Sequence, residues 1–143
     1  MKHLAAVLIL AVCGFAADCP VTFNGVDFWD LTHNQSGINE RSIHMKLHNE
    51  SNKTISAVKA AAIYYNAVKE PFPVTDSGAT QTNIKPGKGK TLLLHEPFLL
   101  TSSQEQYYSL TAYIEKLVFD DGTTWEDNGS HVCSGEWLKH PRK

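Results

Sequence analysis

The stretch Arg41-Ser42-Ile43-His44-Met45-Lys46-Leu47-His48-Asn49 decides the fold that the sequence predicts. Along it every second side chain is apolar, and the side chains between are polar or charged. This period of two separates the faces of a β-strand, whereas a helix repeats about every 3.6 residues. We therefore expect a strand that buries one face and exposes the other, with Ile43, Met45 and Leu47 opposite His44, Lys46 and His48.

The segment that follows is apolar and longer. A polar turn at residues 49–54 leads into residues 55–68, where Val58, Ala60, Ala62 and Tyr64 fit the inner face of a second strand. Three consecutive alanines would also suit a helix. A strand is favoured because the short turn allows a hairpin with the preceding strand.

Further strands are expected on both sides of this pair, at residues 21–29, 80–84, 91–95, 107–119 and 123–125. Pro71 and Pro73 predict an exposed loop through Gly78 that crosses from one sheet to the other. Within residues 107–119 the apolar positions change parity near Glu115 and Lys116, which indicates a β-bulge. About seven short strands and little helix predict an all-β antiparallel sandwich.

An apolar leader precedes the first strand. Residues 1–17 have the charged start, uncharged apolar run and small-residue end of a secretory signal peptide, with cleavage after Ala16 favoured over cleavage after Ala17. Its apolar run is shorter than the roughly twenty residues of a membrane span. We expect a secreted or periplasmic protein with one domain at residues 18–143. The less favoured alternative is lipoprotein maturation at the box that ends in Cys13, which would leave that cysteine lipidated.

The cysteines support export. Removing the leader takes away Cys13 and leaves one pairing, Cys19 with Cys133. Two free thiols are not expected in an oxidising compartment. Because the bridge would join the start of the domain to its last strand region, the first and last strands should lie side by side.

The charge balance argues against a polyanionic partner. The formal net charge is −2 at pH 7, and no block of like charge occurs. Such a chain lacks the basic surface of a nucleic-acid-binding protein. Lys85, Lys88 and Lys90 cluster around Pro86 and two glycines, a pattern typical of a solvated turn.

No catalytic residue or cofactor is predicted. His44 and His48 are the best metal candidates, and a periplasmic copper or zinc carrier is one alternative function. On a strand, however, their α-carbons would lie about 13 Å apart, too far for one ion. A hydrolase with dispersed catalytic residues is a second alternative, although none of its local sequence motifs is present. The acidic pairs Asp120-Asp121 and Glu126-Asp127 are interpreted as solvated turn residues.

Aromatic side chains near strand ends are the predicted binding residues, because aromatic anchors dominate many interfaces. These are Trp29, Tyr107, Tyr108 and Trp137. The expected partner is a protein or a surface glycan. Four Asn-x-Ser/Thr triplets, at Asn34, Asn49, Asn52 and Asn128, would be glycan acceptors in a eukaryotic secretory pathway.

Three short motifs resemble those of the FxLYD-type immunoglobulin-like domains of exported bacterial proteins. They are Asn49-Glu50-Ser51 with Lys53-Thr54-Ile55, then Ile63-Tyr64-Tyr65-Asn66, then Ile84-Lys85-Pro86-Gly87. Residues 118–125 are similar to the strand, turn and tryptophan that end small secreted bacterial proteins of unknown function. The resemblance implies an immunoglobulin-like antiparallel sandwich without a known active site. The leading hypothesis is therefore an exported binding module.

Overall fold

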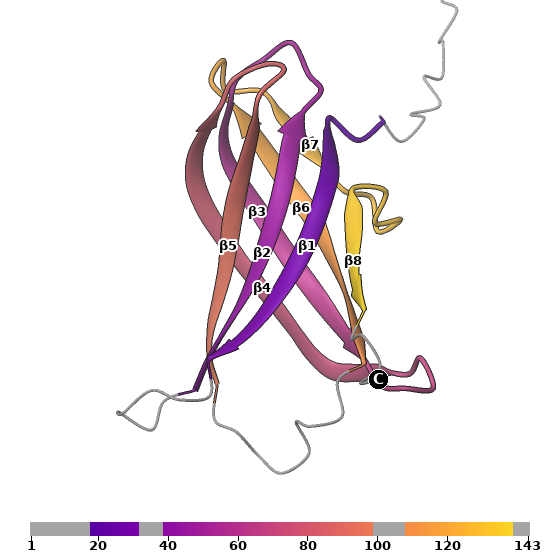
Figure 1. Cartoon of the computed structure of the whole chain (residues 1–143). Helices are drawn as coiled ribbons and strands as arrows, with labels where there is room; N and C mark the ends of the chain where they lie inside the picture. The colour runs from indigo at the N-terminus through magenta and orange to yellow at the C-terminus, as the bar shows by residue number, and fades with distance from the viewer. Residues whose placement is uncertain (1–17, 32–38, 99–107, 139–143) are drawn as a thin grey trace, which may run out of the picture.

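The chain forms two antiparallel β-sheets that face each other (Figure 1). The structure is a computed structural model that describes residues 18–31, 39–98 and 108–138. Within these residues there is no helix, and eight strands follow one another. They are β1 Val21–Leu31, β2 Asn39–Asn49, β3 Ile55–Tyr65, β4 Pro71–Ile84, β5 Gly89–Phe98, β6 Ser109–Phe119, β7 Thr124–Glu126 and β8 Ser134–Leu138.

One sheet has three strands in the order β1-β2-β5. The other has five, in the order β4-β3-β6-β7, with β8 also paired to β6. The prediction of an all-β sandwich of antiparallel sheets is confirmed. Of the described strands, β8 is the one that the sequence did not predict; it is short and contains Gly135, and glycine is a poor strand former.

The core lies between the sheets, where the predicted inner faces meet. Ile43, Met45 and Leu47 of β2 are each at most 2% exposed. From the other sheet β3 contributes Val58, Ala60, Ala62 and Tyr64, and all four are buried. Each large apolar side chain buried in this way contributes roughly 1.5 to 3 kcal/mol to folding. Strand, not helix, is therefore the correct assignment for β3.

The predicted bulge in β6 is confirmed. Lys116 pairs with Lys59 of β3, whereas Ile114 pairs with Ala60, so Glu115 is an extra residue on β6. The extra residue explains why Leu110, Ala112 and Ile114 face the core before the bulge and Leu117 and Phe119 face it afterwards. At the same place β6 changes its outer partner from β8 to β7.

The predicted hairpin between β2 and β3 is wrong, because the turn at residues 50–54 passes from the three-stranded to the five-stranded sheet. Asn49 at the end of β2 is fully buried. Its side-chain amide donates to the carbonyl oxygens of Lys53 and Ile84, both at 2.8 Å. These bonds hold the end of β2 against the end of β4 in the opposite sheet. A buried polar side chain thus sets the crossover.

The loop predicted through Pro71 and Pro73 is also wrong, since both residues belong to β4. Strand β4 is at the end of its sheet, and an edge strand tolerates proline because half of its amides need no ladder partner. The chain crosses between sheets later, at residues 85–88. There the amide of Lys88 donates to the carbonyl of Lys85 at 3.1 Å, and Gly87 has the positive φ of 71° that glycine accommodates without strain.

The disulfide between Cys19 and Cys133 is present, as predicted, with α-carbons 5.2 Å apart. Strands β1 and β8 lie against each other (Figure 1). Each one pairs within its own sheet, so the first and last strands are neighbours without sharing a ladder. A Cβ atom at Gly135 would come within 2.7 Å of the Phe23 ring, so glycine permits the close approach.

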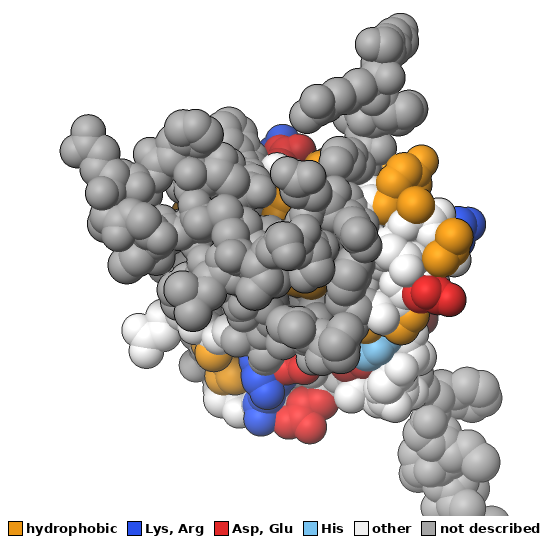
Figure 2. All heavy atoms as spheres, turned by 90° about the horizontal axis from the view of Figure 1, so that it is seen from below, with side chains coloured by type: hydrophobic (Ala, Val, Ile, Leu, Met, Phe, Trp, Pro, Cys, Tyr) orange, Lys and Arg blue, Asp and Glu red, His pale blue; other side chains and the backbone are white. Residues whose placement is uncertain are grey.

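The residues that the structure describes include no helix long and apolar enough to cross a membrane. The predicted leader at residues 1–17, with Cys13, lies outside them. Seen from below, basic and acidic side chains lie next to one another on the described part of that face (Figure 2).

Candidate functional site

An open pocket of about 480 Å³ lies on the outer face of the five-stranded sheet, at the bulge of β6. It is polar and contains side chains of both charges. The lining residues are Lys59, Tyr113, Glu115, Lys116, Glu126, Asp127, Gly129 and His131. Four parts of the chain contribute to the lining: β3, β6, the last residue of β7 and the loop that runs from β7 to β8.

The bulge makes room for this pocket because β6 exchanges partners there. Between β7 and β8 the chain leaves the sheet as a loop at residues 127–133. At its start the amide of Asp127 donates to the carbonyl of Glu115 at 2.9 Å, and at its end the carbonyl of Cys133 accepts from the amide of Ile114 at 2.9 Å. Both ends of the loop are therefore fixed to β6 beside the extra residue.

Inside the loop the carboxylate of Asp127 organises the backbone. It accepts hydrogen bonds from the amide of Gly129 at 3.1 Å and from the amide of His131 at 3.1 Å. The Nδ1 atom of His131 lies 3.0 Å from the same carboxylate. Only 5% of the Asp127 side chain is exposed, so its interpretation as a solvated turn residue is wrong.

His131 has a strained backbone. Its φ of 53° is in the left-handed region, which is uncommon for residues other than glycine, although asparagine, aspartate and histidine are enriched there. Such strain persists only where surrounding contacts enforce it, and it is enriched at functional sites. Here the bonds to Asp127 enforce it, and they direct the imidazole over the sheet.

The imidazole of His131 stacks on the ring of Tyr113, with centroids 3.9 Å apart and planes 36° apart. Tyr113 is only 8% exposed although it lies on the outer face of the sheet. Its cross-strand neighbour is Ala61, whose small side chain leaves room for the ring. Burial, followed by the charge of Glu115, raises the pKa of the Tyr113 phenol above its usual 10.0, so the phenol is neutral at pH 7.

The remaining charges of the pocket form pairs. Lys59 lies 3.0 Å from Glu115, and Lys116 lies 2.8 Å from Glu126. The hydrogen bond from Lys116 lowers the pKa of Glu126 below its usual 4.5. Exposed pairs of this kind add little to stability. The pairs leave the pocket with both hydrogen-bond donors and acceptors.

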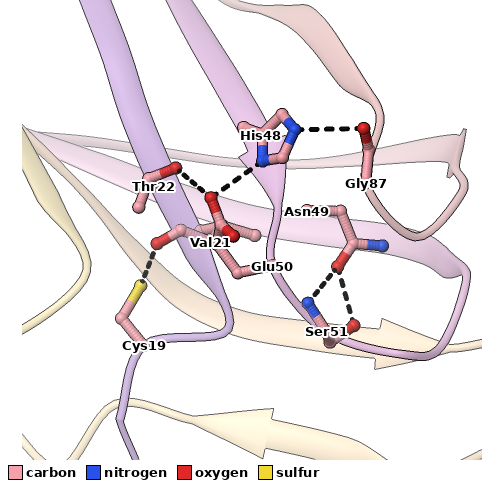
Figure 3. Close-up of polar contacts among 8 residues, drawn as sticks. All are labelled: Cys19, Val21, Thr22, His48, Asn49, Glu50, Ser51 and Gly87. Carbon is pink, nitrogen blue, oxygen red and sulfur yellow. Dashed lines mark hydrogen bonds and ion pairs between the residues drawn. The ribbon is translucent and has the colours of Figure 1, made fainter.

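The two histidines predicted as metal ligands lie on β2 and are already hydrogen bonded. His44 Nε2 lies 3.0 Å from the hydroxyl of Ser42. His48 lies between two acceptors, with Nδ1 2.8 Å from a Glu50 carboxylate oxygen and Nε2 3.1 Å from the carbonyl oxygen of Gly87 (Figure 3). A hydrogen bond from Thr22, with His48, lowers the pKa of Glu50. In the part of the chain that the structure describes, no three His, Cys, Asp or Glu side chains are placed to hold a metal ion.

Of the predicted binding aromatics, the described Tyr108 and Trp137 are not among the residues that line the pocket. The side chain of Trp29 and the whole of Tyr107 lie outside what the structure describes. Tyr108, 42% exposed, precedes β6, and its amide donates to the carbonyl of Tyr65 at 2.9 Å. Trp137 packs against Phe28 of the opposite sheet, with ring centroids 5.1 Å apart, and so helps to close the core.

Sequence reasoning missed the residues that the pocket brings together. The signals were present: the parity change at Glu115, and an aspartate four residues before a histidine that itself stands close to Cys133. They lie in different segments, and only the pairing of β6 with β3, β7 and β8 brings them together.

The Asn-x-Ser/Thr triplets differ in accessibility. Asn52 and Asn128 are exposed, and Asn34 lies outside the described residues. Asn49 is 0% exposed, and its side-chain amide donates to the carbonyl oxygens of Lys53 and Ile84. Its side-chain oxygen accepts from Ser51 (Figure 3). In the folded protein Asn49 therefore holds the fold together and has no amide free for a glycan.

The sequence matches no protein-family model and no curated protein. Among solved structures, a hypothetical protein of Peptoclostridium difficile 630 is 12% identical, with a TM-score of 0.50 over 78% of this chain and 88% of that chain. A Bordetella pertussis protein to which the name ApaA has been given is 14% identical, with a TM-score of 0.47 over 86% of this chain and 95% of that chain. At this identity the first likeness supports the fold alone.

Proposed function

We propose that this chain is an exported, immunoglobulin-like binding module that recognises neutral saccharide units of a surface glycan at the Tyr113–His131 pocket. The role is recognition without catalysis. The observation that carries the proposal is the pocket itself, where a strained histidine, a buried carboxylate and paired charges meet on the outer face of the sheet.

Export is supported by the disulfide between Cys19 and Cys133, because such bonds persist in oxidising compartments and are rare in the cytosol. The leader-like residues 1–17 agree with this. The motifs that resemble FxLYD-type domains support the immunoglobulin-like class and an extracytoplasmic location.

The neutral ligand is supported by the arrangement of charge. Lys59 and Lys116 are each within 3.0 Å of a glutamate, and His131 is paired with Asp127. A charged ligand would have to displace one partner of such a pair. A saccharide hydroxyl donates and accepts, so it can bond to a cation and an anion together. The His131 side chain is 38% exposed, so its ring adds a further surface against which a sugar can pack.

A glycan array tests the proposal directly. The exported protein, isolated with its disulfide intact, is applied to neutral oligosaccharides and, in a second set, to uronic-acid and sulfated ones. We expect binding in the neutral set. Lys116→Ala and Glu126→Ala should each weaken it by about tenfold, since each removes one hydrogen-bonding partner worth about 1.4 kcal/mol.

Asp121→Asn is the matched control, because Asp121 is an exposed carboxylate on a different turn. It should leave saccharide binding unchanged. Binding to charged glycans alone, binding that both pocket variants retain, or no saccharide binding in either set would overturn the proposal.

A further inference from the structure

Two polar groups that line the pocket have no hydrogen-bond partner among the residues that the structure describes. They are the Nε2 atom of His131 and the hydroxyl of Tyr113. In the same part of the chain the Thr82 hydroxyl is the one buried polar side-chain atom that lacks a partner, so the two pocket groups reach solvent. The ring centroids of His131 and Tyr113 are 3.9 Å apart, which brings both groups within reach of one small substituent.

The bond to Asp127 decides what His131 offers to a ligand. A carboxylate only accepts hydrogen bonds, so the Nδ1 atom that lies 3.0 Å from Asp127 carries the hydrogen. In a neutral imidazole the other ring nitrogen then carries none. The Nε2 atom of the neutral ring therefore accepts a hydrogen bond and has none to donate.

Tyr113 offers the complementary group. Burial raises the pKa of its phenol above 10.0, so the hydroxyl keeps its hydrogen at neutral pH and can donate it. The two lysines of the pocket are already held by glutamates, at 3.0 Å for Lys59 and at 2.8 Å for Lys116. A ligand can therefore bond to the His131 acceptor and the Tyr113 donor without breaking an ion pair.

We propose that the pocket selects N-acetylated amino sugars, whose acetamido group donates its N–H to His131 and accepts from Tyr113 at its carbonyl oxygen. This inference rests on the proposed saccharide function and names the class of sugar. A secondary amide has one donor and one acceptor on a planar unit, so it reaches the two groups through separate atoms. A hydroxyl serves both only where they converge on one oxygen. The acetamido methyl can also pack against the His131 side chain, which is 38% exposed.

Titration calorimetry at about pH 8, where histidine side chains are usually neutral, tests the proposal with two probes of equal length. Triacetylchitotriose has an acetamido group on each sugar where cellotriose has a hydroxyl, and the two trisaccharides are otherwise alike. We expect the exported, disulfide-intact protein to bind triacetylchitotriose at least about tenfold more tightly than cellotriose. N-acetylglycinamide, which has the amide without a sugar, should not compete.

Tyr113→Phe removes the hydroxyl and keeps the ring, and His131→Asn removes Nε2 at a backbone conformation that asparagine tolerates. Each should lower the preference to about threefold or less. The readout is the ratio of the two affinities, because a pocket that is merely loosened binds both probes more weakly. Tyr108→Phe is the matched control. It removes the same hydroxyl from a 42% exposed tyrosine that does not line the pocket, and should leave both affinities unchanged.

Equal affinity for the two trisaccharides, a preference that both pocket variants retain, or tight binding of N-acetylglycinamide would overturn the acetamido assignment. Binding of cellotriose alone would also overturn it, while the saccharide function would stand. If no neutral saccharide bound at all, the proposed function would fail, and this inference would fail with it.

Discussion

Cys133 accepts a backbone hydrogen bond from Ile114 at 2.9 Å, immediately before the extra residue that makes the bulge in β6. The same cysteine is bonded through its sulfur to Cys19, just before β1. The disulfide therefore holds the loop of His131 as well as the end of the chain. Cys133 therefore contributes both to the geometry of the pocket and to the covalent cross-link.

Replacing both cysteines should destabilise the domain and loosen the pocket. The bridge joins residues separated by 114 positions. Closing so long a loop lowers the entropy of the unfolded chain. This stabilises the folded state by up to about 5 kcal/mol at room temperature. We expect Cys19→Ser with Cys133→Ser to lower the free energy of unfolding by about 2 to 5 kcal/mol in a urea titration. An unfolding free energy equal to that of the oxidised protein would contradict this, and the reduced wild-type chain is the control.

Asp127→Asn should destabilise the loop at residues 127–133 and release the ring of His131. The carboxylate accepts from two backbone amides and from the imidazole while it is 5% exposed, so its loss weakens several charge-assisted bonds. We expect a loss of about 1 to 3 kcal/mol in unfolding free energy. The ring-current shifts that His131 and Tyr113 impose on each other should also disappear from the NMR spectrum.

Asp120→Asn is the control for this variant, since Asp120 is exposed on the turn between β6 and β7. Its effect should stay within about 0.5 kcal/mol. Equal effects of the two substitutions would show that the Asp127 contacts add nothing.

Asn49→Ala should be among the most destabilising single substitutions outside the apolar core. It leaves the buried carbonyl oxygen of Ile84 without its side-chain donor, whereas the carbonyl oxygen of Lys53 still accepts from the Ser51 hydroxyl at 3.0 Å. An unsatisfied buried group costs about 1 to 3 kcal/mol, so a loss of about 1 to 3 kcal/mol is expected in chemical denaturation. Asn52→Ala, three residues later on the exposed turn, should change stability little. A mild effect at Asn49 would mean that the crossover does not depend on its side chain.

The sequence predicted those parts of the fold that depend on short-range patterns. The alternation of Ile43, Met45 and Leu47, and the parity change around Glu115, each reflect which face of one strand is buried. A period of two carries that information within a few residues. The pairing of Cys19 with Cys133 also followed, because the expected cleavage left one combination.

Strand pairing could not be read in the same way. The turn after Asn49 is short enough for a hairpin, and the crossover is decided by a bond to Ile84, 35 positions away. The edge position that lets β4 contain prolines is likewise a property of the whole sheet. The pocket depends on both kinds of information. Asp127 and His131 are close in the sequence, whereas the hydrogen bond from Ile114 to Cys133 joins residues that are far apart in it.

The carboxyl of Asp121 should titrate well below its usual range. A hydrogen bond from the Thr123 hydroxyl, followed by one from Lys53, lowers its pKa from 3.8 to about 2. The folded-state pKa is therefore lower than the unfolded one, so the carboxylate stabilises the fold above about pH 4, and this contribution is lost as the pH falls towards about 2. Thr123→Val removes the largest cause and should move the pKa of Asp121 back towards 3.8, as followed by the NMR shift of its carboxyl carbon. A pKa that is the same in both proteins would show that the Thr123 hydroxyl does not hold this carboxylate in its ionised form.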